Sequence, residues 1–366
     1  MRIVLCIVLI LIFTLMHPMS GQAAPTVSAT NAILIEQSTG RVLFEKNANE
    51  EQLIASITKL MTAIIAVESG KMQEEATASR EAIYTEGSSI YLEQGEKMSI
   101  EDLVYGLILR SGNDAAVTIS EHIGGSMEGF VYLMNEKARW LGMTNSSFEN
   151  PHGLDSDNHY STAYDMAMLM RYAMDNDQFR EIVGTKTYKS DRRSYSWQNK
   201  NKLLTQLYEN STGGKTGYTR TAGRTLVSSA NKNGMDLIAV TINAPDDWQD
   251  HINLFEWGFE NYDMTSIAEE GQEKYRLKGS DKETIGYLHH NVLFPLTEGE
   301  MADVDKQTYL LNENRGRTDD IIGKTMFHLD GEQIAETPIF NDQLDIRGKG
   351  FFSNVLSTYK KVTGLD

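Results

Sequence analysis

Three short stretches, Ser56-Ile57-Thr58-Lys59, Ser111-Gly112-Asn113 and Lys215-Thr216-Gly217, determine both the fold and the chemistry that we expect of this chain. Each stretch alone is a weak signal, because Ser-x-x-Lys recurs at Ser229 and Ser357 and Ser-x-Asn recurs at Ser229. Lys-Thr-Gly occurs once. The prediction rests on the order of the stretches, their wide spacing and the secondary structure expected around each.

The first stretch opens a buried helix. Apolar residues recur at helical spacing over 57–67, with little polar surface before Ser69-Gly70 ends the pattern. Ser56 and Lys59 then project from one face of the first turn. A serine hydroxyl needs a base within hydrogen-bond distance to become a nucleophile, and burial at a helix N-terminus lowers the pKa of a lysine enough for it to be that base. For an isolated Ser-x-x-Lys, the better interpretation is a serine cap followed by a solvated lysine.

The second stretch lies on a turn between apolar helical segments. The Ser111 hydroxyl can pass a proton to a leaving amine, and the Asn113 amide can bind a peptide carbonyl. Taken alone, Ser-Gly-Asn is more often simple turn chemistry.

The third stretch precedes a predicted strand. Lys215 beside Thr216 at a sheet edge can hold a carboxylate, and Gly217 lets a substrate backbone approach closely. The backbone N–H of Tyr218, paired with that of Ser56, can form an oxyanion hole. A turn entering a strand is the alternative for this stretch alone. In this order, the three stretches form the residue set of a penicillin-recognising serine acyl-transfer enzyme.

Over nearly its whole length the chain resembles the low-molecular-mass penicillin-binding proteins, serine D-alanyl-D-alanine carboxypeptidases of peptidase family S11. The stretches that carry the resemblance are 54–63, 109–116, 152–155, 161–167, 199–204 and 213–219. The stretches 55–70 and 246–251 are most similar to the sporulation-type enzyme of endospore-forming Gram-positive bacteria, which trims spore cortex. The resemblance implies Ser56, Lys59 and Ser111 as catalytic residues. It implies Asn113, Lys215, Thr216, Gly217 and Tyr218 as substrate-binding residues, without a metal or cofactor.

The expected fold class is α+β. An early hairpin over 32–44 and strands over 213–243 form an antiparallel sheet, with a mainly helical block inserted between them. The hairpin signal Asn233-Gly234 joins the last two strands, and a further helix is expected over 248–262. This DD-peptidase/β-lactamase-like domain should span 24–266, followed by a small all-β domain over 272–345. The resemblance also implies an amphipathic C-terminal segment, 350–366, that rests on the membrane; packing against its own domain is the alternative.

The first 23 residues predict a signal peptide. Arg2 gives a positive start, residues 3–16 form an apolar run too short for a comfortable membrane span, and small residues precede a cleavage after Ala23. We expect an exported protein in the cell wall or on the outer face of the cytoplasmic membrane. The only cysteine, Cys6, lies in this run, so the mature chain would lack cysteine catalysis, thiolate metal sites and disulfides.

Composition and motifs also exclude several classes of function. The formal net charge of −17 argues against a nucleic-acid partner. The sequence contains no His-Glu-x-x-His and no Gly-x-Ser-x-Gly, which disfavours a zinc peptidase and a hydrolase with a Ser–His–Asp triad.

The leading hypothesis is a D,D-carboxypeptidase that limits cross-linking of the cell wall or spore cortex. Its partners would be peptidoglycan stem peptides ending in D-Ala-D-Ala, with β-lactam antibiotics as covalent inhibitors. A class A-like β-lactamase shares the three stretches, but it needs a carboxylate to activate the deacylating water, and 150–165 offers only Asp155 and Asp165 nearby. A non-catalytic wall-binding or β-lactam-sensing protein is the third hypothesis. A sensor usually needs a membrane span, and no apolar run after residue 23 is long enough.

One stretch departs from the family pattern. Some relatives carry an arginine after the second strand that helps to hold the substrate carboxylate, whereas 244–248 contains no cation. Lys215 and Thr216, with Lys200 or Lys202, would then bind the carboxylate.

Overall fold

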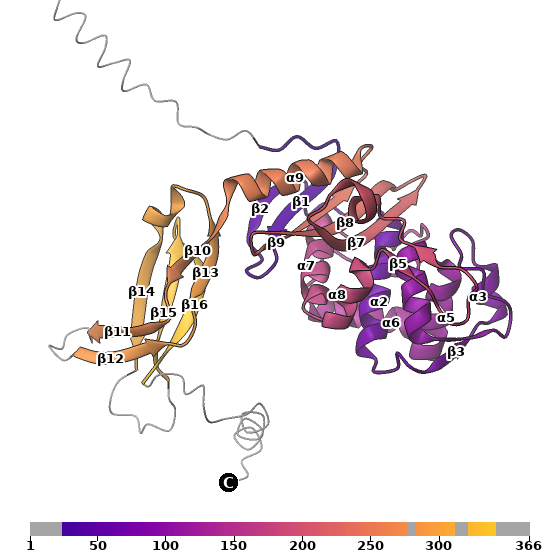
Figure 1. The fold of residues 1–366 in the computed structure, drawn as a ribbon, viewed down its shortest axis with the longest axis horizontal. Coiled ribbons are helices and arrows are strands. Elements are labelled where there is room, and N and C mark those ends of the chain that lie inside the picture. Colours follow the sequence, from indigo (N-terminus) through magenta and orange to yellow (C-terminus); the bar gives the residue numbers. More distant parts are fainter. Residues whose placement is uncertain (1–23, 277–282, 312–320, 342–366) are drawn as a thin grey trace, which may run out of the picture. The chain divides into compact units, whose positions relative to one another are not determined.

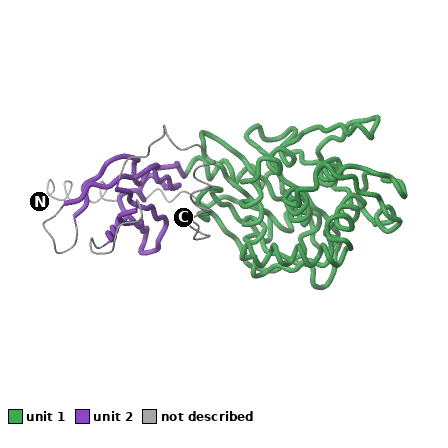
Figure 2. The backbone as a smooth tube through the Cα atoms, turned by 90° about the horizontal axis from the view of Figure 1, so that it is seen from below, with its two compact units in different colours: residues 1–261 green, residues 262–366 purple. Residues whose placement is uncertain are grey.

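The computed structural model describes residues 24–276, 283–311 and 321–341. The predicted signal peptide and the C-terminal segment 350–366 lie outside the described residues. The chain divides into two compact units, Met1–Asn261 and Tyr262–Asp366, coloured separately in Figure 2. Among the described residues, no helix has the length and apolar character needed to cross a membrane.

A five-stranded antiparallel sheet forms the base of the first unit, in the order β2-β1-β9-β8-β7. Its strands are β1 (Asn31–Glu36), β2 (Val42–Lys46), β7 (Ser211–Thr219), β8 (Gly223–Lys232) and β9 (Met235–Ile242). The early hairpin joins the late strands through β1, where Ile33 pairs with Val240. The predicted α+β fold is therefore confirmed, with the helical block inserted between strands that are neighbours in the sheet.

Turn chemistry explains why β8 and β9 are adjacent. Asn233 and Gly234 both have positive φ, at 54° and 83°, as a tight hairpin of the type I′ kind requires. At the other edge of the sheet, β7 pairs with β8 so that Lys215 lies opposite Val227 and Tyr218 opposite Arg224. The stretch Lys215-Thr216-Gly217 therefore lies on an edge strand of this sheet.

Helices cover the sheet on both faces (Figure 1). On one face lies α9 (Asp247–Asn261), and α7 (Ala163–Met174) packs against the other; the central helix α2 (Lys59–Glu68) packs in turn against α7. Every residue of α2 from Lys59 to Val67 is buried, as its apolar pattern predicts. The remaining helices of the block are α3 (Arg80–Tyr84), α4 (Ile100–Tyr105), α5 (Asn113–Gly124), α6 (Met127–Trp140) and α8 (Asp177–Gly184).

Two details differ from the expected helices. Ser56 does not begin α2, because it lies on a separate 3-10 turn, η1 (Ala55–Thr58), and the α-helix starts at Lys59. Between α4 and α5 the chain forms a π-helical turn, η2 (Gly106–Arg110), which leads into the turn that holds Ser111. Short irregular pieces complete the unit: β3 (Glu75–Thr77) with β4 (Lys97–Ser99), β5 (Thr187–Tyr188) with β6 (Trp197–Gln198), and η3 (Leu203–Leu207).

The described residues of the second unit form a small all-β region, apart from the 3-10 turn η4 (Glu300–Asp303). One pair joins β10 (Asp263–Ala268) to β13 (Val292–Leu296). A five-stranded sheet has the order β11 (Gly271–Arg276), β12 (Glu283–Leu288), β16 (Glu332–Phe340), β15 (Ile321–Leu329) and β14 (Asp305–Leu310). Phe294, Leu296 and Phe327 are among the buried side chains of its core, so this region has apolar packing of its own.

Candidate active site

Lys59 lies at the centre of the site and contacts the predicted nucleophile directly. Its Nζ is 3.0 Å from Ser56 Oγ, 2.7 Å from Asn113 Oδ1 and 2.6 Å from the carbonyl oxygen of His152. The side chain is fully buried. Burial, followed by repulsion from the Lys215 and Lys200 cations, holds the pKa of Lys59 well below its usual range. The lowered pKa favours the neutral amine opposite the serine hydroxyl.

The second stretch reaches the site because of the turn after η2. Ser111 adopts a left-handed conformation, with φ of 64°, which directs its side chain toward β7, and α5 begins two residues later. The Asn113 amide is held on both sides, since its Oδ1 accepts from Lys59 and its Nδ2 donates to the carbonyl of Glu86 at 2.5 Å. Asn113 therefore orients Lys59 in this structure, in addition to the substrate contact expected of it.

Lys215 approaches Ser111 from β7. Its Nζ donates to Ser111 Oγ at 3.1 Å and to the carbonyl of Thr216 at 2.6 Å, and its side chain is buried. Burial, with a smaller contribution from the Lys200 cation, lowers the pKa of Lys215 to about 7. Ser56–Lys59 and Ser111–Lys215 thus form two hydroxyl–amine pairs within one site.

Gly217 permits a close approach between β7 and the turn that carries Ser56. A Cβ at this position would lie 2.8 Å from the backbone nitrogen of Ser56 and would overlap the Thr225 hydroxyl. The Thr225 hydroxyl in turn donates to the carbonyl of Ile54 at 3.0 Å. The Thr225 hydroxyl and the Ser56 backbone therefore occupy the space beside Gly217, and β7 lies next to the nucleophile.

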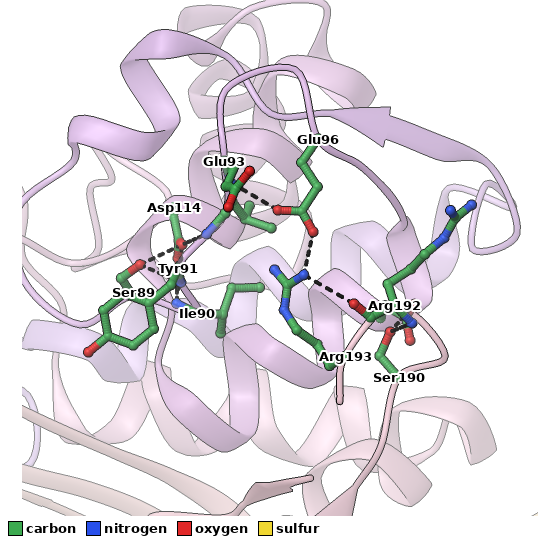
Figure 3. A network of polar contacts seen from close by, with 11 residues as sticks. Ser89, Ile90, Tyr91, Glu93, Glu96, Asp114, Ser190, Arg192 and Arg193 are labelled. Atoms are coloured by element: carbon green, nitrogen blue, oxygen red, sulfur yellow. Dashed lines mark hydrogen bonds and ion pairs between the residues drawn. The ribbon is translucent and has the colours of Figure 1, made fainter. Parts of the chain in front are cut away.

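A buried carboxylate next to Asn113 fixes the loop that borders the site (Figure 3). Asp114 accepts hydrogen bonds from Ser89 Oγ at 2.6 Å and from the backbone N–H groups of Ile90 and Leu92 at 3.0 and 3.1 Å. Farther along, Glu96 forms an ion pair with Arg193 (Figure 3). These contacts hold 86–96 in place, and Lys200 Nζ donates to Ser88 Oγ at 3.1 Å.

A cavity of about 310 Å³ opens over the nucleophile. Its lining residues are Ser56, Ser88, Ser111, Lys200, Thr216, Gly217, Tyr218, Arg224, Asp247 and Trp248. Lys59, Asn113 and Lys215 lie beneath it, each buried and bonded to a partner described above. Lys202 is not among the lining residues.

Comparison with known proteins identifies the family of the chain. The family model described as D-alanyl-D-alanine carboxypeptidase, peptidase S11, matches residues 19–246. This chain belongs to that family. Within this serine peptidase family, the chain is 34% identical over 345 residues to D-alanyl-D-alanine carboxypeptidase DacF of Bacillus subtilis (strain 168), covering 89% of this chain and 87% of the relative. It is 32% identical to DacC of Escherichia coli (strain K12), covering 91% and 88%.

Solved structures of the carboxypeptidase family have the same fold. Penicillin-binding protein 5 from Haemophilus influenzae superposes with a TM-score of 0.72 at 30% identity, covering 87% of this chain and 98% of that one. Penicillin-binding protein 6B from Escherichia coli gives 0.68 at 28% identity, covering 88% and 97%. The predicted resemblance to the D-alanyl-D-alanine carboxypeptidases of peptidase family S11 is confirmed.

Sequence reasoning missed a charged pair at the rim of the carboxypeptidase site. Arg224 donates through Nε to Asp247 Oδ1 at 2.9 Å, and its guanidinium lies 5.5 Å from the centre of the Trp248 ring. Residues 244–248 contain no cation, but β8 supplies Arg224 to this rim. Arg224 lies opposite Tyr218 in the pairing of β7 with β8, so a predicted register for this hairpin would have placed Arg224 beside the site. No sequence signal points to Ser88.

Among the described residues, no group of three or more His, Cys, Asp or Glu side chains could hold a metal ion. The side-chain polar groups that line the cavity include hydroxyls, the Lys200 amine, the Arg224 guanidinium and the Asp247 carboxylate, and the Lys59 and Lys215 amines contact the Ser56 and Ser111 hydroxyls. The chemistry that this site can supply is therefore proton transfer between hydroxyls and amines, together with binding of an anion.

Proposed function

We propose that the protein is a serine-type D-alanyl-D-alanine carboxypeptidase that removes the terminal D-alanine from peptidoglycan stem pentapeptides through an acyl-enzyme on Ser56. The contact between Lys59 Nζ and Ser56 Oγ, with the lowered pKa of Lys59, carries this proposal. Removing the terminal D-alanine would limit cross-linking of the cell wall or spore cortex.

Acylation starts from the neutral Lys59 amine. Its two N–H groups match the two carbonyl oxygens of Asn113 and His152, which leaves the lone pair facing the Ser56 hydroxyl. Lys59 takes the hydroxyl proton as Ser56 Oγ attacks the carbonyl between the two D-alanines. The backbone N–H groups of Ser56 and Tyr218 stabilise the oxyanion that forms.

Departure of D-alanine needs a proton on its nitrogen. Ser111 is placed to deliver it, because its hydroxyl contacts Lys215, whose ammonium form, with a pKa of about 7, can return a proton to the Ser111 oxygen and become the neutral amine. Water then hydrolyses the ester on Ser56. The substrate backbone lies along the edge of β7, where peptide groups that face away from β8 can pair with it.

The terminal carboxylate of the substrate is held by Thr216 and the surrounding cations. Lys200 and Arg224 line the cavity, and Lys215 lies beneath it, whereas Asp247 is the one carboxylate among the cavity-lining residues and is already bonded to Arg224. The excess of positive charge favours an anionic chain end.

β-Lactams should acylate Ser56 and remain bound. In the class A-like alternative, a carboxylate activates water for rapid deacylation. Asp155 accepts from Thr219 Oγ1 at 2.8 Å, Asp165 accepts from Ser146 Oγ at 2.7 Å, and neither lines the cavity. This arrangement favours a long-lived penicilloyl adduct over turnover.

We also propose where the protein acts and what each segment of the chain contributes. Members of this family act on peptidoglycan, which implies extracytoplasmic action. Residues 1–23 would direct export, 24–266 would carry the peptidase site, 272–345 would form the β-rich domain, and 350–366 would contact the membrane surface.

The test is release of D-alanine from a peptide ending in D-Ala-D-Ala, with Ser56→Ala as the control. Release that depends on Ser56 supports the proposal. A folded wild-type protein that releases no D-alanine but turns over penicillin rapidly would instead establish the β-lactamase alternative.

A further inference from the structure

The peptide that precedes Ser56 has an unusual conformation. Ala55 is buried and has a φ of +49°, a left-handed geometry that is unfavourable for a non-glycine residue. Such a residue persists only where its surroundings hold it in place. Its carbonyl oxygen accepts a hydrogen bond from Thr58 Oγ1 at 2.8 Å.

A histidine from a distant loop completes this contact. Thr58 Oγ1 lies 2.8 Å from His159 Nε2, and both side chains are buried. The single hydroxyl proton of Thr58 is donated to Ala55, so the imidazole must donate at Nε2. The backbone N–H of Glu149 donates to Nδ1 at 3.1 Å, which makes Nδ1 an acceptor. The hydrogen bonds therefore run in one direction, from Glu149 through His159 and Thr58 to Ala55.

The surroundings of the ring favour this neutral tautomer. Burial lowers the pKa of His159 to about 4. The Phe148 ring packs edge-on against the imidazole at 5.7 Å, and this limits its rotation. The loop between Glu149 and His159 also supplies the His152 carbonyl that binds Lys59, so one loop contacts both the base and the nucleophile turn.

The geometry of the peptide bond connects this chain of hydrogen bonds to the reaction. The Ala55 carbonyl and the Ser56 N–H belong to one planar peptide unit. Fixing the carbonyl oxygen through Thr58 therefore fixes the direction of the Ser56 N–H on the other side. That N–H is the proposed oxyanion donor, and the same residue carries the nucleophilic oxygen.

We propose that His159, acting through Thr58, is a positioning residue that holds the Ala55–Ser56 peptide in the orientation needed for acylation. This inference rests on the proposed function, because it assigns a role in forming the Ser56 acyl-enzyme. His159 touches neither the substrate nor a reacting atom in this account.

Matched substitutions test the inference. Thr58→Val removes the hydroxyl at nearly constant volume, Thr58→Ser keeps it, and His159→Phe removes both ring nitrogens. We expect Thr58→Val and His159→Phe each to slow acylation by penicillin about 10- to 100-fold, the range for a displaced reacting group or a weakened oxyanion donor. Thr58→Ser should remain within about threefold of wild type, and the double variant should be no slower than Thr58→Val alone, because the two residues act in series. The loss should appear in kcat for D-alanine release with KM nearly unchanged.

Nitrogen NMR of the wild-type imidazole gives a readout that does not depend on activity or on a variant that folds. We expect a protonated Nε2 and an unprotonated Nδ1 for His159, and a protonated Nδ1 would overturn the inference. Wild-type rates in Thr58→Val and His159→Phe, or multiplied losses in the double variant, would also overturn it while leaving the proposed function intact. A wild-type protein that forms no Ser56-dependent adduct would overturn both.

Discussion

At Gly153, the addition of a single methyl group should leave the protein folded but slow the acylation of Ser56. Its φ is +86°, and a Cβ there would lie 2.5 Å from the carbonyl carbon of Ala55 and 2.8 Å from Thr58 Oγ1. Ordinary van der Waals contact begins near 3.4 Å, so in Gly153→Ala the loop and the nucleophile turn must move apart by at least about 1 Å. Because a displacement of about 1 Å at a reacting centre can cost about 100-fold, we expect acylation of Ser56 to slow by about two orders of magnitude.

A second glycine provides the control. Gly142 has a similar φ of +74°, and a Cβ added there would have no neighbouring atom within 4 Å. Gly142→Ala carries the same backbone strain, about 1–2 kcal/mol, without the steric clash. The assay is the rate of labelling by a fluorescent penicillin, with thermal unfolding of each variant measured in parallel. Labelling of Gly153→Ala within about threefold of Gly142→Ala would refute the argument that this close contact positions the nucleophile.

Three further predictions concern the charged groups around the cavity. Asp114→Asn weakens the hydrogen bonds that hold 86–92, so the free energy of unfolding in urea should fall by about 1–3 kcal/mol and KM should rise, because Ser88 lines the cavity. Arg224→Gln removes a cation from the rim, so KM for a peptide with a free carboxylate should rise about tenfold, while that for the C-terminal amide should change little. The value of kcat/KM should fall above about pH 7, because Lys215 loses its proton there. It should also fall at low pH, because Lys59 gains a proton. In Lys215→Arg the side chain stays charged at alkaline pH, so the decline above about pH 7 should disappear.

Local patterns in the sequence were enough to predict the main elements of the first unit. The apolar periodicity after Ser56 gives the buried helix α2, and Asn233-Gly234 gives the hairpin between β8 and β9, because both depend on residues adjacent in the chain. The three stretches also predicted which side chains share one site. Lys59 indeed lies at hydrogen-bond distance from Ser56, and Lys215 from Ser111.

Features that depend on distant segments were not accessible in this way. The left-handed Ala55 and the 3-10 turn at Ser56 are held by contacts with 149–159, about a hundred residues away. The Arg224–Asp247 pair forms only because β8 and the start of α9 meet at the same rim. The close approach at Gly217 likewise reflects packing of β7 against the nucleophile turn rather than a local preference. Tertiary contacts of this kind leave no periodic signal in the sequence.

The central claim is that Ser56 forms the acyl-enzyme with Lys59 as its base. Mass spectrometry of the protein after incubation with penicillin, followed by peptide mapping, tests it most directly. We expect one adduct per chain on the peptide that contains Ser56, persistent over many minutes, absent from Ser56→Ala and formed far more slowly in Lys59→Ala. An adduct on another residue, or undiminished labelling of folded Ser56→Ala, would contradict it.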